Sequence, residues 1–342
     1  MADRKDSKKR VRVGSRSSQL AMTQTETVVS ALKEQHPEIE FVITTMETIG
    51  DKNLDKPLPQ IGTTNLFTKE LEHALASNEV DMIVHSLKDI PTTLSDDFVI
   101  SAITKRADPT DALLLAPKHS GKTSLQDLPP GSVVGTSSLR RIAQLKRLCP
   151  HLEFKSIRGN LNTRLQKLDR GDEYDAAVMA TAGLERLGWH DRIVARLDPL
   201  VCMYAVGQGA LGVETRKRDE RMTELMSCLN DPHSVFICSV ERGFLHRLEG
   251  GCSVPVGIHS TLDDSNRLTV RGAVFSLDGS QKLESIVSKD LPSNWSSLAF
   301  YSMTLVGGGI GEELAAMLLE KGAKPILAEA KRCSEMEGFP TK

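Results

Sequence analysis

Aromatic residues are scarce in this chain of 342 residues: they make up 4% of it, although apolar residues as a class reach 39%. Hydrophobic cores must therefore be built mainly from Leu, Val, Ile, Ala and Met. Long apolar runs are also missing, since no stretch approaches the roughly 18 residues of a membrane-spanning helix. Residues 1–10 are rich in charge and no apolar segment follows them, so we expect a disordered N-terminus and no secretory signal.

Paired cysteines are absent as well. The six cysteines are scattered, with no CxxC pair and no metal-ligand spacing, which argues against a disulfide framework or a zinc site and favours a reducing compartment. The net charge of −2 creates no overall field that would attract nucleic acid or an acidic membrane. We therefore expect a monomeric cytoplasmic protein with a small-molecule ligand, and neither nucleic acid, membrane nor metal as a partner.

Strand-like apolar runs alternate with helical patterns over the first two thirds of the chain. Residues 11–20 and 132–141 share one order, which is a strand, a glycine, a cluster of hydroxyl side chains and a helix. This repetition predicts two similar α/β domains with mostly parallel sheets. The glycine-rich segment 204–214 would carry the chain back to the first domain. A third, α+β unit follows, with two or three strands and a helix over 312–321. The expected boundaries are 11–105 with 205–228 for domain 1, 106–204 for domain 2 and 229–342 for domain 3.

Basic side chains gather where the predicted strands end. In open α/β sheets, ligands bind outside the carboxyl ends of the strands. The residues at such ends are Arg16, Lys88, Asp89, Arg140, Arg141 and Arg158. Arginine pairs bidentately with carboxylate or phosphate, and the chain has no GxxxxGK[ST] pattern for nucleotide phosphate. The set therefore indicates a ligand with several carboxylates, whereas any single arginine could belong to a solvated helix face.

Cys252 and Asp89 stand out as residues that could carry chemistry. A helical pattern over 237–248 ends at Gly250 and Gly251, and an alternating strand pattern begins at Val254, so Cys252 falls on a tight loop. Such a loop can present a thiol to a cleft, although a buried, inert cysteine is the alternative. Asp89 follows a buried strand and precedes a proline, so it should lie on a turn. Its carboxylate could move protons or stabilise a cation, or could simply cap the turn.

The glycine run at 307–311 resembles a dinucleotide-binding fingerprint. The position of the third glycine is taken by Glu312, however, and no acidic residue stands at the end of a following strand. We therefore do not interpret this run as a nucleotide site.

Taken together, these motifs resemble those of the hydroxymethylbilane synthase family, also called the porphobilinogen deaminase family, over about residues 11–330. The segments that carry the resemblance are Leu66–Glu72, Val84–Asp89, Val134–Arg141, Ile157–Asn160, Ala205–Gly212 and Leu248–Pro255. The family's fold is two α/β domains similar to periplasmic binding proteins plus a small α+β domain. Its enzymes belong to tetrapyrrole (heme) biosynthesis, join four porphobilinogen molecules head to tail with loss of ammonia, and release linear hydroxymethylbilane.

The resemblance also implies a role for each site residue. A dipyrromethane cofactor would be attached through a thioether to Cys252, and Asp89 would assist deamination and stabilise the azafulvenium and pyrrole cations. The residues implied to hold the cofactor are Lys88, Ser138, Arg140 and Arg141. Those implied to hold the substrate and the growing chain are Arg16, Ser18, Gln24, Arg158, Arg164 and Arg186.

Two departures from the family pattern lie in the segment 50–65, which we interpret as a lid. Family members usually have lysines where this chain has Gln60 and Thr64. A catalytically impaired family member is therefore one alternative. A non-catalytic anion-binding or solute-binding module of the same fold is another, but such a module would have no use for Cys252 beside Asp89.

Overall fold

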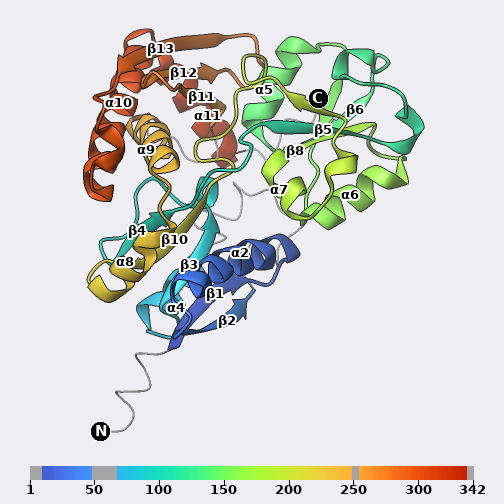
Figure 1. Ribbon diagram of the computed structural model, residues 1–342. Coiled ribbons are helices and arrows are strands. Elements are labelled where there is room, and N and C mark those ends of the chain that lie inside the picture. Colours follow the sequence, from blue (N-terminus) through green and yellow to red (C-terminus); the bar gives the residue numbers. More distant parts are fainter. Residues whose placement is uncertain (1–9, 48–67, 249–253, 337–342) are drawn as a thin grey trace, which may run out of the picture.

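The structure is a computed structural model that describes residues 10–47, 68–248 and 254–336. This part of the chain forms two α/β domains, each built on a five-stranded sheet, and a third domain with a three-stranded sheet (Figure 1). The predicted fold class is therefore confirmed. The lid segment with Gln60 and Thr64, as well as Cys252, lies outside the described residues. We expected Arg10 to belong to a disordered N-terminus, but it is the first residue of the first strand and pairs with Glu40 at 2.8 Å; residues 1–9 lie outside the described residues.

The first sheet has the strand order β2-β1-β3-β10-β4. β1, β2 and β3 run parallel, whereas β10 runs antiparallel to both of its neighbours, β3 and β4. Four strands thus point in one direction and β10 in the other. The strands are β1 (Arg10–Arg16), β2 (Glu40–Met46), β3 (Met82–Ser86), β4 (Phe98–Ile103) and β10 (Leu211–Arg216).

The second sheet has the order β7-β6-β8-β5-β9 and the same arrangement of strand directions, although its antiparallel strand β5 comes first in the sequence and β10 comes last in the first sheet. β6 runs parallel to β7 and β8, and β5 runs antiparallel to β8 and β9. The two domains predicted from the repeated sequence pattern therefore share one arrangement. The strands are β5 (Asp111–Leu115), β6 (Val133–Gly135), β7 (Glu153–Lys155), β8 (Ala176–Ala180) and β9 (Ala195–Leu197).

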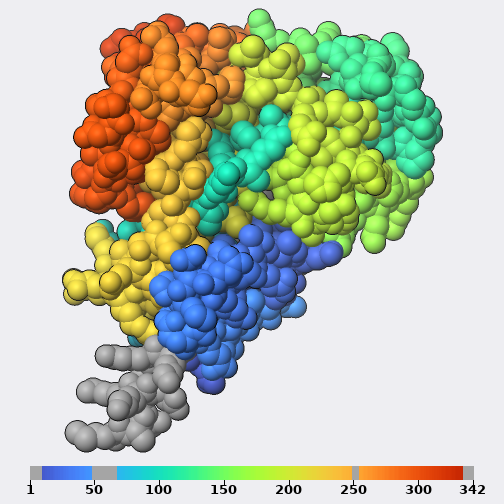
Figure 2. All heavy atoms as spheres, viewed as in Figure 1, coloured from blue at the N-terminus to red at the C-terminus, as the bar shows by residue number. Residues whose placement is uncertain are grey.

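Helices that follow the parallel strands cover these sheets. Ser18 caps the first of them, accepting a hydrogen bond from the Ala21 N–H at 3.4 Å, and the apolar face of this helix packs on β1 and β3. The first domain contains α2 (Gln19–Gln35), α4 (Lys69–Ala76) and α8 (Glu220–Met226), and the second contains α5 (Leu139–Leu148), α6 (Leu161–Arg170) and α7 (Thr181–Arg186). The short 3-10 helices are η2 (Leu87–Asp89), η3 (Pro117–His119), η4 (Leu125–Asp127), η5 (His190–Arg192), η6 (Ser227–Leu229) and η7 (Trp295–Ser297). α2 also contacts α7, so the two domains meet there (Figures 1 and 2).

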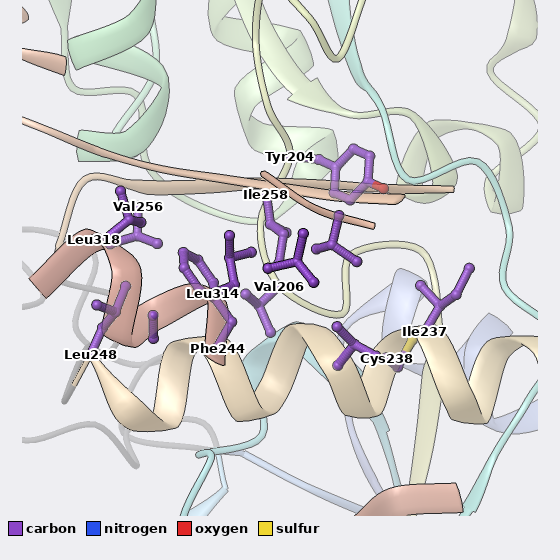
Figure 3. Close-up of a cluster of buried hydrophobic side chains, with 14 of the residues drawn as sticks. Tyr204, Val206, Ile237, Cys238, Phe244, Leu248, Val256, Ile258, Leu314 and Leu318 are labelled. Atoms are coloured by element: carbon purple, nitrogen blue, oxygen red, sulfur yellow. The ribbon is translucent and has the colours of Figure 1, made fainter. Parts of the chain in front are cut away.

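The third domain packs three helices against an antiparallel sheet with the order β11-β12-β13. Its core includes Phe244 and Leu248 from one helix, Leu314 and Leu318 from another, and Ile258 from the sheet (Figure 3). The elements are α9 (Pro232–Arg247), β11 (Val256–Leu262), β12 (Arg267–Phe275), β13 (Lys282–Asp290), α10 (Phe300–Glu320) and α11 (Ala323–Met336). None of the described helices is long and apolar enough to cross a membrane.

The glycine run at 307–311 lies inside α10, which begins at Phe300 rather than near Glu312 as predicted. Its glycines allow α10 to approach α9 closely. A side chain at Gly311 would collide with the backbone carbonyl of Val240, and one at Gly243 would collide with the backbone of Gly308. The run is therefore a helix-packing feature, which agrees with our rejection of a nucleotide site.

The chain passes between the two α/β domains twice, through the crossing segments 104–110 and 198–210. α9 of the third domain holds both of them. Arg106, on the first crossing, donates to both carboxylate oxygens of Glu241 at 2.8 and 3.0 Å. Glu241 also accepts from the N–H of Gly207, on the second crossing, at 2.8 Å. One buried carboxylate of α9 thus connects both crossings to the third domain.

Candidate functional site

A cavity of about 390 Å³ lies between the two α/β domains, lined by residues from the carboxyl ends of parallel strands in both sheets. This is the place where the strand pattern predicted a ligand. Nine of the predicted site residues line it, namely Arg16, Ser18, Gln24, Lys88, Asp89, Arg141, Arg158, Arg164 and Arg186. The structure therefore brings together residues that are up to 170 positions apart in the sequence.

The first domain contributes the side chains that follow β1 and β3. Arg16 is the last residue of β1, and Gln24, one turn inside α2, donates to the Ser86 hydroxyl at 2.9 Å. Lys88 and Asp89 form the end of η2, which continues directly from β3. The turn predicted at Asp89 is therefore a single turn of 3-10 helix, and it directs the Lys88-Asp89 pair to the cavity.

The second domain contributes four arginines from three helices and one loop. Arg141 belongs to the first turn of α5, Arg164 to α6 and Arg186 to α7, whereas Arg158 follows β7. Backbone carbonyls fix three of these side chains, since Arg141 donates to Val178 O at 2.9 Å. Arg164 Nε donates to Gly159 O at 2.8 Å, and an Arg186 guanidinium nitrogen donates to Gly209 O at 2.6 Å.

Positive charge dominates the cavity. Among the described residues that line it, six side chains are cationic and Asp89 alone is acidic. Burial lowers the pKa of Lys88 to about 8, although the neighbouring Asp89 partly offsets this effect. Burial, and then the charges of Arg141 and Arg158, lower the pKa of Arg164 to about 10. These shifts show that the cations are crowded and poorly hydrated, so an anionic ligand would relieve their repulsion.

Gln208 also lines the cavity, and the sequence analysis did not select it. Its side-chain oxygen accepts from Lys88 Nζ at 3.2 Å. The residue stands between Gly207 and Gly209, whose φ angles are +70° and +93°. A side chain at Gly209 would also collide with the carbonyl of Ala107. A polar residue between two glycines was the available signal. We interpreted this segment as a connection between domains and as one of the segments that carry the family resemblance, but assigned no role to Gln208.

Two predicted cofactor residues, Ser138 and Arg140, are not among the residues that line the cavity. Arg140 is buried, and one of its terminal nitrogens donates to Asp111 Oδ2 at 2.7 Å and to Met203 O at 2.5 Å. Asp111 was missed by the sequence analysis and no motif marks it, because it is the first residue of an otherwise apolar strand. The predicted contact of Ser138 and Arg140 with a cofactor stays a prediction.

α9 is fixed against the segment that follows Asp89. Arg242 of this helix donates to Ile90 O at 3.0 Å and to Pro91 O at 2.6 Å. α9 ends at Arg247 and β11 begins at Val256, so the segment with Cys252 connects these two elements. The helix that leads to the predicted cofactor cysteine is thus tied to the neighbours of the predicted catalytic carboxylate.

This arrangement can bind a ligand with several carboxylates and can place one carboxylate of its own among them. Within the described ranges, no group of three or more His, Cys, Asp and Glu side chains could hold a metal ion. Asp89 can transfer protons and stabilise a positive charge electrostatically, within a site that attracts anions.

Comparison with known proteins gives consistent matches over most of the chain. The family model described as porphobilinogen deaminase, dipyromethane cofactor binding domain, matches residues 11–224, and that of the porphobilinogen deaminase C-terminal domain matches residues 235–295. A porphobilinogen deaminase of Gloeobacter violaceus is 52% identical over 268 residues, which cover 78% of this chain and 81% of that protein. Those of Synechococcus elongatus and Eremothecium gossypii are each 46% identical and cover 93% of this chain and 95% and 96% of their own lengths.

Solved structures show only a weak likeness. The VFT2 domain of Bordetella pertussis BvgS, in its double-mutant form, has a TM-score of 0.41 at 13% identity and covers 67% of this chain and 89% of that chain. We base no argument on a likeness of this size.

Proposed function

The chain belongs to the porphobilinogen deaminase family, and from this premise we propose that the cavity between its two α/β domains is the active site. Its activity is that of the family, in which four porphobilinogen molecules are joined head to tail with loss of ammonia and linear hydroxymethylbilane is released. One observation carries the assignment to the cavity: among the lining residues that the structure describes, six side chains are cationic and Asp89 alone is acidic. Each porphobilinogen has an acetate and a propionate, so a growing chain of pyrroles needs such a surplus of cations.

The family's dipyrromethane cofactor fits the same cavity. Two linked pyrrole rings have four carboxylates, and Lys88 and Arg141 offer crowded cationic groups beside Asp89. We assign these two side chains to the cofactor, and Ser138 and Arg140 remain further candidates. When bound, the dipyrromethane supplies the pyrrole carbon to which the first substrate ring is joined.

Asp89 is the proposed catalytic residue. Positive charge develops on the substrate as ammonia leaves, and the only carboxylate among the described lining residues can stabilise it. The same carboxylate can accept or return a proton, since its 3-10 turn at the end of β3 holds it at the cavity. Lys88 would pair with neighbouring ligand carboxylates and so keep them away from the Asp89 carboxylate.

The arginines on the second domain are proposed to bind the substrate and the growing chain, together with Arg16, Ser18 and Gln24 of the first domain. Arg158, Arg164 and Arg186 come from three separate segments and line the same cavity. The backbone contacts of Arg164 and Arg186 leave other N–H groups of each guanidinium for ligand carboxylates. Successive rings could therefore use different arginines.

Cys252 is the proposed point of cofactor attachment. The support comes from α9, because Arg242 ties this helix to the two residues after Asp89, and the helix leads into the segment with Cys252. A thioether formed there would keep the growing chain attached until hydrolysis releases it.

We also propose the domain boundaries 11–105 with 205–228, 106–204 and 229–342, which keep each sheet within one domain apart from Arg10, the first residue of β1. We further propose that the protein acts as a monomer in the cytoplasm, on the basis of its scattered cysteines and small-molecule substrate.

Intact-mass measurement tests the proposed site. The purified protein should be heavier than its sequence by two linked pyrrole units, and peptide mapping should locate them at Cys252. Cys252→Ser should lack both the added mass and the activity. The control is Cys228→Ser at an exposed cysteine, which should keep both. Active enzyme with an unmodified Cys252 would contradict the assignment.

A further inference from the structure

Asp111 lies outside the predicted set of site residues, yet it accepts hydrogen bonds from two of them, Arg140 and Arg141. We propose that Asp111 is a positioning residue, which holds Arg141 and Lys88 in the orientation that binds the cofactor carboxylates. The inference rests on the proposed function, because it assumes that these two cations hold the cofactor.

Both carboxylate oxygens of Asp111 are used. Oδ1 accepts from an Arg141 terminal nitrogen at 2.6 Å and from Gln208 Nε2 at 2.9 Å. Oδ2 accepts from Arg140 at 2.7 Å and lies 3.7 Å from the thiol of Cys202. The residue is fully buried, so the low surrounding polarity strengthens each of these contacts. Asp111 therefore fixes two arginines and one glutamine, of which Arg141 and Gln208 line the cavity.

Gln208 extends this influence to Lys88. A carboxylate can only accept, so the amide nitrogen of Gln208 must face Asp111, and it also donates to Pro109 O at 2.7 Å. The amide oxygen is thereby turned toward Lys88 Nζ, from which it accepts at 3.2 Å. Because Gln208 is almost completely buried, its amide has little freedom to flip. The position of the Lys88 ammonium thus depends on a carboxylate in the other domain.

Arg141 is held by two hydrogen bonds, which use two of the five N–H groups of its guanidinium. One terminal nitrogen donates to Val178 O at 2.9 Å and the other to Asp111. Its Nε is buried and has no hydrogen-bond partner among the described residues. Arg141 also lines the cavity, so a ligand carboxylate can supply the missing acceptor.

Charge gives a second reason for the role of Asp111. The groups that act on Lys88 are Asp89 and Asp111, which favour its protonated form, and Arg140 and Arg141, which oppose it. Burial by itself would raise the pKa of Asp111, but the two arginines hold it well below its usual range. Removal of this charge would leave Arg140, Arg141 and Lys88 facing one another with Asp89 as their remaining close counter-charge.

Cofactor uptake by the full-length apo-protein tests the proposal. Wild type and Asp111→Asn are prepared from cells that make no porphobilinogen. They are then incubated with porphobilinogen at pH 7 and pH 8.5, and intact mass follows the gain of two pyrrole units. Asp111→Asn should gain them at least tenfold more slowly at pH 7. Its rate should also fall more between pH 7 and pH 8.5 than that of wild type, because Lys88 then loses its proton at lower pH.

Asp175→Asn is the matched control. Asp175 also belongs to the second domain, accepts from the Val133 N–H at 2.7 Å and pairs with Lys118 at 2.9 Å and His119 at 2.7 Å, but does not line the cavity. Its loss should lower thermal stability and leave the uptake rate of the folded protein and its pH dependence unchanged. A purely structural Asp111 would behave in the same way, and that result would overturn the proposal.

Gln208→Met provides a second variant in case Asp111→Asn does not fold. It removes the connection to Lys88 and keeps the ion pairs between Asp111 and the arginines. We expect slower uptake with the same direction of pH change, and wild-type behaviour of this variant would refute the connection to Lys88. If wild type itself gained no pyrrole units, the proposed function would fail. Uptake by wild type and by both variants at equal rates would overturn the role of Asp111 alone.

Discussion

The buried carboxylate of Glu241 should be a major source of stability for the third domain. Its side chain is completely buried, Arg106 donates to both of its oxygens, and the pair joins α9 to the first crossing segment. Glu241→Gln keeps the shape and still offers an oxygen to the Gly207 N–H, but it leaves the Arg106 cation without its counter-charge. Removal of one partner of a buried pair costs about 3–5 kcal/mol. Because Gln keeps part of the hydrogen bonding, we expect about 3 kcal/mol.

Tryptophan fluorescence can isolate this effect, since the chain has two tryptophans. Trp295 stacks against Phe236 of α9 with ring centroids 5.4 Å apart, so it reports on the third domain. Trp189 belongs to the second domain, so the experiment is done in a background that carries Trp189→Phe, which leaves Trp295 as the reporter. With an m-value of roughly 3 kcal/mol per M of urea, a loss of about 3 kcal/mol lowers the unfolding midpoint by about 1 M.

Asp290→Asn is the control for this experiment. Asp290 pairs with Arg267 in the same domain at 3.1 Å, but the two side chains are 76% and 55% exposed. Exposed pairs contribute about 0–1 kcal/mol, so its midpoint should move little. If Glu241→Gln unfolded at the same urea concentration as Asp290→Asn, the carboxylate would not hold the crossings and the reasoning would be wrong.

Three further predictions concern the cavity. Asp89→Ala should fold normally and lose nearly all turnover, whereas Asp89→Glu should keep part of its turnover. Steady-state assays measure both, and near wild-type turnover of Asp89→Ala would exclude the catalytic role. Arg158→Leu and Arg164→Leu should each weaken binding about tenfold to a hundredfold and accumulate enzyme-bound chains of different length. Identical intact-mass profiles for both variants and wild type would mean that neither arginine holds the chain. Because the pKa of Lys88 is about 8, cofactor uptake by the apo-protein should fall between pH 7 and pH 9 as its ammonium loses a proton, and Lys88→Arg should remove that fall. A pH dependence shared by wild type and Lys88→Arg would assign the titration to another group.

The sequence allowed the fold class and most of the cavity to be predicted, because strand ends and basic residues are local features. Arg16 ends a predicted strand, Lys88 and Arg158 come shortly after one, and parallel sheets bring such ends to one edge. The start of α10 was predicted too late in the sequence. Its glycines disfavour a helix in isolation, and the close contact with α9 that compensates for them is not visible in the sequence.

Asp111 and Gln208 illustrate what the sequence did not reveal. Their importance comes from partners that are about 30 to 120 residues away, which no spacing rule predicts. Arg140 shows the converse. Its neighbour Arg141 lines the cavity and Arg140 does not, although both belong to the same motif, because consecutive residues on a helix point in different directions.

The chain returns from the second domain to add β10 to the first sheet, and this return has a consequence for synthesis on the ribosome. β10 separates β3 from β4 in the first sheet, and it is made only after the whole second domain. A nascent chain that ends before Leu211 can complete the second sheet, whose strands all lie within residues 111–197, but cannot close the first. Until β10 arrives, β3 has an unpaired edge beside its apolar side chains, which is the kind of surface that chaperones and aggregation both recognise. The domain that begins the chain is therefore the later of the two to complete its sheet.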